Sequence, residues 1–223
     1  FEQLSRERGV DVKARIEQDL FRAAVEQVLA NPETFTNMSP RAWSALVELG
    51  RVIGEPQFVH EPVRRFRHFV ESQFFYDGTW SEGSPDYAAQ TLGGLESIVQ
   101  LLKGYSDPPG YTDPQDGSRF DDLELAHSFP LMQQARLALQ KMHLPNGRAV
   151  PVHDTWSTSQ RKATDRSEAY LLPALGHACI GGGEGSQQTQ FHLTWSGGYG
   201  HAHADSLSLL LFSNGQELLS DLG

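Results

Sequence analysis

The pattern of apolar residues changes about two-thirds of the way along this 223-residue chain, and that change limits the folds it can adopt. In the first part apolar residues recur at helical spacing. Ten of the 21 glycines, by contrast, fall between Gly176 and Gly223, where apolar residues alternate as in strands. We therefore predict an α part over residues 1–172, irregular from about 147, and the beginning of an antiparallel β part over residues 173–223.

Five segments carry the apolar periodicity of amphipathic helices. They are residues 10–30, 39–54, 58–70, 84–103 and 121–142. Asn31-Pro32 ends the first segment, Ser39-Pro40 starts the second, and Gly54 suits a C-terminal cap. Helices joined by short turns pack antiparallel to their neighbours, so the hairpins form a bundle, a solenoid or a toroid. The lack of a fixed sequence period argues against a regular solenoid.

The segment over residues 104–120 is too rich in Pro, Gly and Asp to form a helix or a strand. Its length is typical of a functional loop, and a plain surface loop fits equally well.

Three strands are expected in the last part of the chain. They cover residues 187–195, 206–212 and 217–221. Asn214-Gly215 between the last two is a strong hairpin signal.

The composition excludes several classes of protein. Lys plus Arg is 18 and Asp plus Glu is 28, which gives a net charge of −10 and argues against general binding to nucleic acid or to a membrane surface. No apolar run is long enough for a membrane span. The single cysteine, Cys179, excludes an internal disulfide and a cysteine-rich zinc site. Because the sequence starts at Phe1 and stops inside an expected strand, we expect an internal piece of a longer protein.

The segment GGYGHAHADSLSLLLFSNGQELLSDLG, residues 197–223, concentrates groups that bind metals. His201, His203 and Asp205 alternate, so on a strand they share one face. The Asn-Gly hairpin would return Asp221 to His203, which makes two-thirds of a zinc site. Alternatively, these residues could be polar groups on a solvent-exposed face of a strand. We disfavour this interpretation because leucines at 207, 209 and 211 would lie on the same face as the histidines, which predicts that this face is buried. A zinc hydrolase with an HxHxD motif is a minority alternative, since Ser206 stands where those enzymes usually have a further histidine.

Three blocks of sequence together resemble the heparinase II/III-type polysaccharide lyases. They are TNMSPRAWSALVELGRVIGEPQFV at residues 36–59, YDGTWSEGSPDYAAQT at residues 76–91, and GYGHAHADSLSLLLFSNGQELLSDLG at residues 198–223. The resemblance implies an incomplete (α/α) toroid followed by an antiparallel β-sandwich, of which this chain holds the beginning. It also implies a periplasmic or secreted location.

The chemistry that this resemblance implies is β-elimination at a uronic acid of an acidic polysaccharide. A poorly acidic C5 proton must leave beside a carboxylate, so the site needs a neutraliser, a base and an acid. Asn37 resembles the neutraliser, Tyr87 the catalytic acid with the base role also open to it, and His201 the catalytic histidine. His203 and Asp221 resemble two ligands of a structural zinc ion, whose third ligand would lie beyond this segment.

Each of these residues also has a structural interpretation. Asn37 could cap the following helix, and Met38 departs from relatives that carry a histidine there. Tyr87 could be an ordinary core or rim residue. Weaker candidates for substrate contacts, for which we favour structural roles, are Trp80, Glu82, Gln90 and Arg119. The same holds for His153 and Asp154, which could line a cleft.

The leading hypothesis is therefore a lyase that cleaves a uronic-acid polysaccharide. The charge of −10 favours a substrate with fewer charges than heparin. A non-catalytic carbohydrate-binding relative of the same fold is the second hypothesis, and the zinc hydrolase is the third. Oligomeric state is left open.

Overall fold

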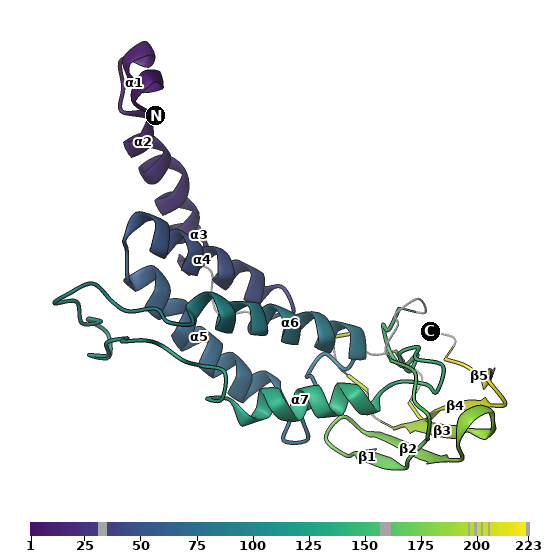
Figure 1. The fold of residues 1–223 in the computed structure, drawn as a ribbon. Helices are drawn as coiled ribbons and strands as arrows, with labels where there is room; N and C mark the ends of the chain where they lie inside the picture. The colour runs from purple at the N-terminus through teal and green to yellow at the C-terminus, as the bar shows by residue number, and fades with distance from the viewer. Residues whose placement is uncertain are drawn as a thin grey trace. The chain divides into compact units, whose positions relative to one another are not determined.

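The computed structural model describes residues 1–30, 35–156 and 162–221, without residues 196, 199, 202 and 205 (Figure 1). The predicted helix end at Asn31-Pro32 and the predicted Asp205 lie outside the described residues. Two compact units are present: unit 1 comprises Phe1–Arg67 and Gly94–Ala126, and unit 2 comprises His68–Gly93 and His127–Gly223. The predicted domains over 1–172 and 173–223 are defined by element type and stay a prediction.

The N-terminal helical run is confirmed from Val12 onward. It consists of α2 (Val12–Arg15), a π-helical stretch η1 (Ile16–Arg22) and α3 (Ala23–Ala30). Asp11 caps its start by accepting the Ala14 N–H at 3.0 Å. A short helix α1 (Glu2–Arg8), which the sequence analysis did not predict, precedes it and ends at Gly9 in the left-handed conformation.

Four further helices follow, and the first three agree with prediction. They are α4 (Ser39–Ile53), α5 (Gln57–Gln73), α6 (Pro85–Leu102) and α7 (Pro130–Lys141). The predicted helix over 121–142 is wrong in its first part, because Leu123 pairs with Tyr105 in an isolated bridge and Asp122 adopts a φ of +48°. Pro130 then permits a helix only from its own position onward. The toroid stays a prediction, and no described helix is both long and apolar enough to cross a membrane.

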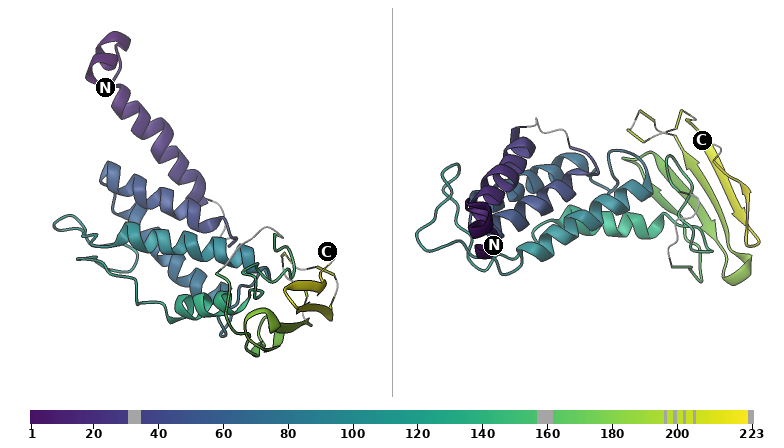
Figure 2. Two further views of the ribbon diagram at one scale, coloured as in Figure 1. Left: turned by 45° about the vertical axis from the view of Figure 1, so that its right-hand side comes forward. Right: turned by 90° about the horizontal axis from the view of Figure 1, so that it is seen from above.

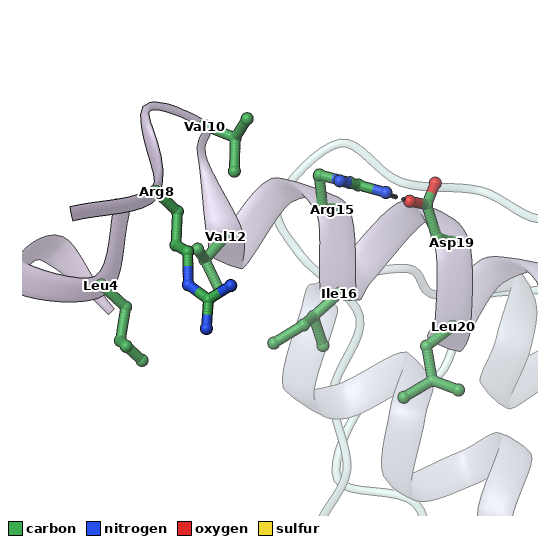
Figure 3. Close-up of a pocket in the computed structure, with 8 residues that line it drawn as sticks. All are labelled: Leu4, Arg8, Val10, Val12, Arg15, Ile16, Asp19 and Leu20. Carbon is green, nitrogen blue, oxygen red and sulfur yellow. Dashed lines mark hydrogen bonds and ion pairs between the residues drawn. The ribbon is translucent and has the colours of Figure 1, made fainter. Parts of the chain in front are cut away.

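The core of unit 1 is built from one face of each of α4, α5 and α6. The apolar side chains of these three helices that lie in unit 1 and are at most 2% exposed are Leu46, Val47, Val59, Val63, Phe66, Leu95, Ile98 and Leu102. Gly94 allows α6 to approach α4 closely, because a Cβ at this position would lie 2.8 Å from the Cβ of Pro40. The run from α1 to η1 instead leaves apolar side chains such as Leu4 and Leu20 exposed along a hollow of about 660 Å³ (Figure 3).

Unit 2 contains a five-stranded antiparallel sheet in the order β1-β2-β3-β4-β5 (Figure 2). The strands are β1 (Tyr170–Leu172), β2 (His177–Gly182), β3 (Thr189–Thr194), β4 (Ser208–Ser213) and β5 (Gln216–Leu219). The last three and the Asn214-Gly215 hairpin confirm the prediction, and both hairpin residues have positive φ as a type I′ turn requires. The first two strands were not predicted.

One face of the sheet is buried, and it is not the face that the sequence analysis expected. Leu210 and Phe212 of β4 are 2% exposed and pack in a cluster with residues on and after α7, such as Ala138 and Val150. The predicted burial at the parity of Leu207 and Leu209 is therefore wrong, since these are 69% and 37% exposed. The segment that follows α7 packs on the face of β4 that carries Leu210 and Phe212, which is opposite to the face that the sequence analysis expected to be buried.

The buried face also carries two histidines in hydrogen-bond contact. Nε2 of His177 lies 3.2 Å from Nδ1 of His192, and both side chains are fully buried. Burial lowers the pKa of His177 well below its usual value and lowers the pKa of His192 to about 4. The same burial raises the pKa of the neighbouring Cys179 thiol to about 12, so this thiol is unreactive.

We predict that acid destabilises the chain through these two histidines. An unfolded histidine binds a proton below about pH 6.5, whereas folded His192 does so only near pH 4, so the unfolded state holds more protons in this window. The free energy of unfolding should fall by roughly 1–2 kcal/mol through His192 between pH 7 and pH 5, and the lowered pKa of His177 acts in the same direction. Denaturant unfolding at both pH values measures this. His192→Gln should weaken the pH dependence and the exposed-site control His68→Gln should keep it; equal slopes in all three proteins would refute the assignment.

Candidate functional site

The candidate site lies in unit 2, where the start of α6 meets two loops. Asp86 in the first turn of α6 accepts the backbone N–H of Trp156 at 2.7 Å. Ser84 precedes the helix, and its hydroxyl donates to the backbone carbonyl of Asp154 at 3.0 Å. These contacts fix residues 154–156 beside the first turn of α6, which carries Tyr87.

Tyr87 and His201, two of the predicted catalytic residues, lie against each other. Their rings stack with centroids 3.6 Å apart and planes 15° apart. The backbone holds the histidine from two sides: His201 donates its N–H to the Glu82 carbonyl, and its own carbonyl accepts the N–H of Asp154, both at 3.0 Å. His201 lies in a turn before β4 and not on a strand as predicted.

Both ring nitrogens of His201 face carboxylates. Nδ1 lies 2.9 Å from Oδ2 of Asp154, which is a hydrogen bond, whereas Nε2 lies 3.7 Å from Oε2 of Glu82, which is too long for one. Donation from Nδ1–H to Asp154 leaves the lone pair on Nε2. The hydrogen bond from His201 lowers the pKa of the Asp154 carboxyl below its usual value, so Asp154 is ionised at neutral pH.

Trp80 orients Glu82 and does not line the site. Its indole N–H donates to Oε2 of Glu82 at 3.0 Å, and its ring packs against Phe69 and Phe74. Only 2% of Trp80 is exposed, so we do not propose a stacking contact with a sugar for it. Glu82, by contrast, reaches the site.

His203 lies between two carboxylates. Its Nδ1 is 3.1 Å from Oδ2 of Asp221, as the hairpin predicted, and its Nε2 is 3.3 Å from Oδ1 of Asp154. A neutral imidazole can donate to only one of two carboxylates. The second contact therefore calls for a positive charge, either a proton on the ring or a cation bound by the ring nitrogen and the carboxylate.

The separation of these donor atoms is compatible with zinc. Ligand atoms at zinc–nitrogen and zinc–oxygen distances of about 2.0–2.1 Å in a tetrahedron lie about 3.3 Å apart. His203 Nδ1 and Asp221 Oδ2, at 3.1 Å, have this spacing. The side chain of Asp221 is 4% exposed, which suits a ligand better than a solvated surface group.

The remaining predicted site residues have different surroundings. Asn37 lies in unit 1, half-buried in the turn before α4, so its convergence with Tyr87 and His201 stays a prediction. Gln90 is half-buried on α6, three residues after Tyr87 and hence on the same face. Arg119 of unit 1 donates to the backbone carbonyls of its own loop, Pro108 at 2.8 Å and Tyr111 at 2.9 Å, which gives it a structural role.

A second cluster of histidine and carboxylates lies in unit 1. His60, Asp113 and Asp116 bring possible ligand atoms within 4.8 Å of one another. Arg64 already supplies the positive charge there, since its Nη1 lies 3.0 Å from Oδ2 of Asp113. Burial opposes ionisation of Asp113, but the Gln115 N–H and Arg64 outweigh it and lower the pKa of this carboxyl. The cluster fastens the loop over residues 104–120 to α5, and we interpret it as structural.

Sequence reasoning considered Asp154 as a residue that could line a cleft but favoured a structural role for it, and it missed Trp156. Asp154 bridges both histidines, and Trp156, which is 56% exposed, has its ring centroid 5.8 Å from that of Tyr87. No local pattern marks either residue, because each reaches the site only through the contacts with Ser84 and Asp86.

The fold, helices followed by an antiparallel sheet, is similar to the folds of several solved structures. A crystal structure of heparinase III is similar over 86% of this chain and 35% of that chain, with a TM-score of 0.67 and 15% identity. A mutant heparan sulfate lyase from Pedobacter heparinus is similar over 91% of this chain and 35% of that chain, with a TM-score of 0.61 and 16% identity. This chain therefore spans about a third of the length of the structures it matches.

These similarities confirm the predicted resemblance at the level of fold. No protein-family model matches the chain, and no curated protein does.

Proposed function

We propose that this chain is part of a lyase that cleaves a uronic-acid polysaccharide by β-elimination. The observation that supports this most directly is the stack of Tyr87 on His201, with His201 Nδ1 hydrogen-bonded to Asp154. A phenol and an oriented imidazole are an acid and a base within reach of one sugar ring. The shared fold with heparinase III supports the same class of reaction.

In the proposed reaction a base removes the C5 proton of the uronate. The electron pair of the C–H bond forms the double bond between C4 and C5, and the bond from C4 to the glycosidic oxygen breaks. An acid gives that oxygen a proton, so no net charge or electron is lost. Tyr87 supplies this proton through its hydroxyl, and Nε2 of His201 accepts the C5 proton from the substrate. Asn37 donates its amide hydrogens to the uronate carboxylate, which stabilises the developing negative charge.

A zinc ion would be held by His203 and Asp221, together with a third ligand outside this segment. It would supply a fixed positive charge that holds the turn carrying His201, and it takes no part in proton transfer. Calcium or magnesium is a less suitable ion for this site than zinc, because these ions prefer oxygen ligands and His203 offers an imidazole nitrogen.

The charges around the site favour a substrate of modest charge density. Glu82, Asp154 and Asp221 lie around the two histidines, and the whole chain has a net charge of −10. Carboxylates beside the site repel sulfate groups. We therefore expect turnover of an unsulfated uronate polymer to exceed turnover of heparin.

The test is a turnover assay of the full-length protein with zinc on a panel of uronate polymers. The expected product has a double bond conjugated with the carboxylate and absorbs in the ultraviolet. Binding without this absorbance would identify a non-catalytic carbohydrate-binding relative. New reducing ends without the absorbance would identify a hydrolase.

A further inference from the structure

We propose that Asp154 is a positioning residue that couples the catalytic histidine His201 to the metal ligand His203. This inference rests on the proposed function for its catalytic part. In this proposal a single carboxylate contacts two imidazole rings, those of His201 and His203, and holds both in place.

The geometry gives each carboxylate oxygen its own partner. Oδ2 lies 2.9 Å from Nδ1 of His201, and Oδ1 lies 3.3 Å from Nε2 of His203. The backbone of Asp154 is held as well, since its N–H donates to the His201 carbonyl and its carbonyl accepts the Ser84 hydroxyl, both at 3.0 Å. The side chain is 51% exposed, so burial does not force these contacts. The hydrogen bonds of the Asp154 backbone place its side chain between the two histidines.

With a cation bound between His203 Nδ1 and Asp221, the two contacts assign one hydrogen to each imidazole ring. An ionised carboxylate only accepts, so His201 presents Nδ1–H and His203 presents Nε2–H to Asp154. His201 then keeps the Nε2 lone pair that the proposed reaction uses. His203 keeps the Nδ1 lone pair, which points to Asp221 at 3.1 Å and is available to a metal ion. A change in one carboxylate therefore disturbs both the reaction and the metal site.

Asp154→Asn is the informative substitution, because an asparagine side chain has one acceptor oxygen and cannot serve both histidines. We expect kcat to fall by about 100-fold with KM changed by less than about threefold, since orientation is lost and substrate binding is kept. The zinc affinity should fall by about 10–100-fold. Nitrogen-15 NMR of the histidines should show a changed tautomer at His201. Asp165→Asn, a substitution of an exposed aspartate in the same unit, should leave all three unchanged.

Asp154→Glu keeps the carboxylate and should recover part of both kcat and zinc affinity, which a merely structural role would not predict. Unchanged kcat, zinc affinity and tautomer in Asp154→Asn would overturn the proposal. Equal losses in the asparagine and glutamate variants, with the tautomer of His201 unchanged, would also overturn it. If the wild-type protein shows no lyase activity, the proposed function is wrong. The zinc affinity and the histidine tautomer would still test the role of Asp154, because neither measurement depends on lyase activity.

Discussion

Tyr87→Phe is expected to lower the lyase kcat by about 10²–10⁴-fold, the usual range for loss of one positioned acid or base. The substitution removes only the hydroxyl group. The aromatic ring that stacks on His201 at 3.6 Å is kept, so the position of the imidazole should not change. The effect should therefore appear in kcat, with KM, zinc content and the melting temperature close to those of the wild-type protein.

Tyr76→Phe is the matched control. Tyr76 lies in the same sequence block as Tyr87, but it is 73% exposed. Removal of its hydroxyl should leave kcat unchanged within about twofold, as for surface groups away from a site. Full activity in Tyr87→Phe would show that the phenol transfers no proton, and the acid would then have to be sought elsewhere in the site.

The helices that sequence reasoning predicted best are those with both a start and a stop signal. Ser39-Pro40 and Gly54 bound α4 closely, and Gly54 adopts the left-handed conformation expected of a C-cap. The segment after residue 120 has a helical apolar pattern as well, yet its backbone pairs through Leu123 with Tyr105. That pairing is a tertiary contact, and periodicity cannot reveal it.

The strands were predicted where alternation is clear and missed where small residues weaken it. β2 contains Ala178, Gly181 and Gly182, which have low strand propensity, and its place in the sheet comes from six pairs of residues with β3. Parity gave the wrong buried face for β4 because the side that is covered depends on the segment after α7. Such a choice between two faces is made by tertiary packing.

In the candidate site, too, contacts set by local sequence could be predicted, whereas contacts set by tertiary packing could not. The approach of Asp221 to His203 could be predicted from a hairpin, because a short turn fixes the register of its strands. The stack of Tyr87 on His201 joins a helix to a turn far along the chain, and only the resemblance to a known family linked these residues. Asp154 carried no such link, although its two oxygens reach both histidines.

Gly78→Ala is expected to destabilise the chain by about 3–5 kcal/mol, the sum of a strained backbone and a steric clash. Gly78 has a φ of +84°, and an added Cβ would lie 2.4 Å from the carbonyl carbon and oxygen of Gln134 in α7. These are backbone atoms of a helix, so they cannot move aside without displacing α7 and its buried residues. For a chain of this size the melting temperature should fall by roughly 6–20 °C.

Gly110→Ala separates the two causes. Gly110 has nearly the same φ, +81°, but an added Cβ would meet no atom within 4 Å. Gly110→Ala should therefore lower the free energy of unfolding by the backbone strain alone, about 1–2 kcal/mol. Equal losses of stability in the two variants, measured by denaturant unfolding, would show that the contact with α7 contributes nothing.

The same turn links the stability of unit 2 to its chemistry. Asp77 accepts the Thr79 hydroxyl at 2.6 Å with one oxygen and the Ala174 N–H at 2.8 Å with the other, so it ties the turn to the segment between β1 and β2. The chain then continues through Trp80 to Glu82, whose carbonyl holds the backbone of His201 at 3.0 Å. Gly78→Ala should therefore lower kcat even at temperatures where the variant remains folded, whereas Gly110→Ala should not. A fully active, folded Gly78→Ala protein would show that the site does not depend on this turn.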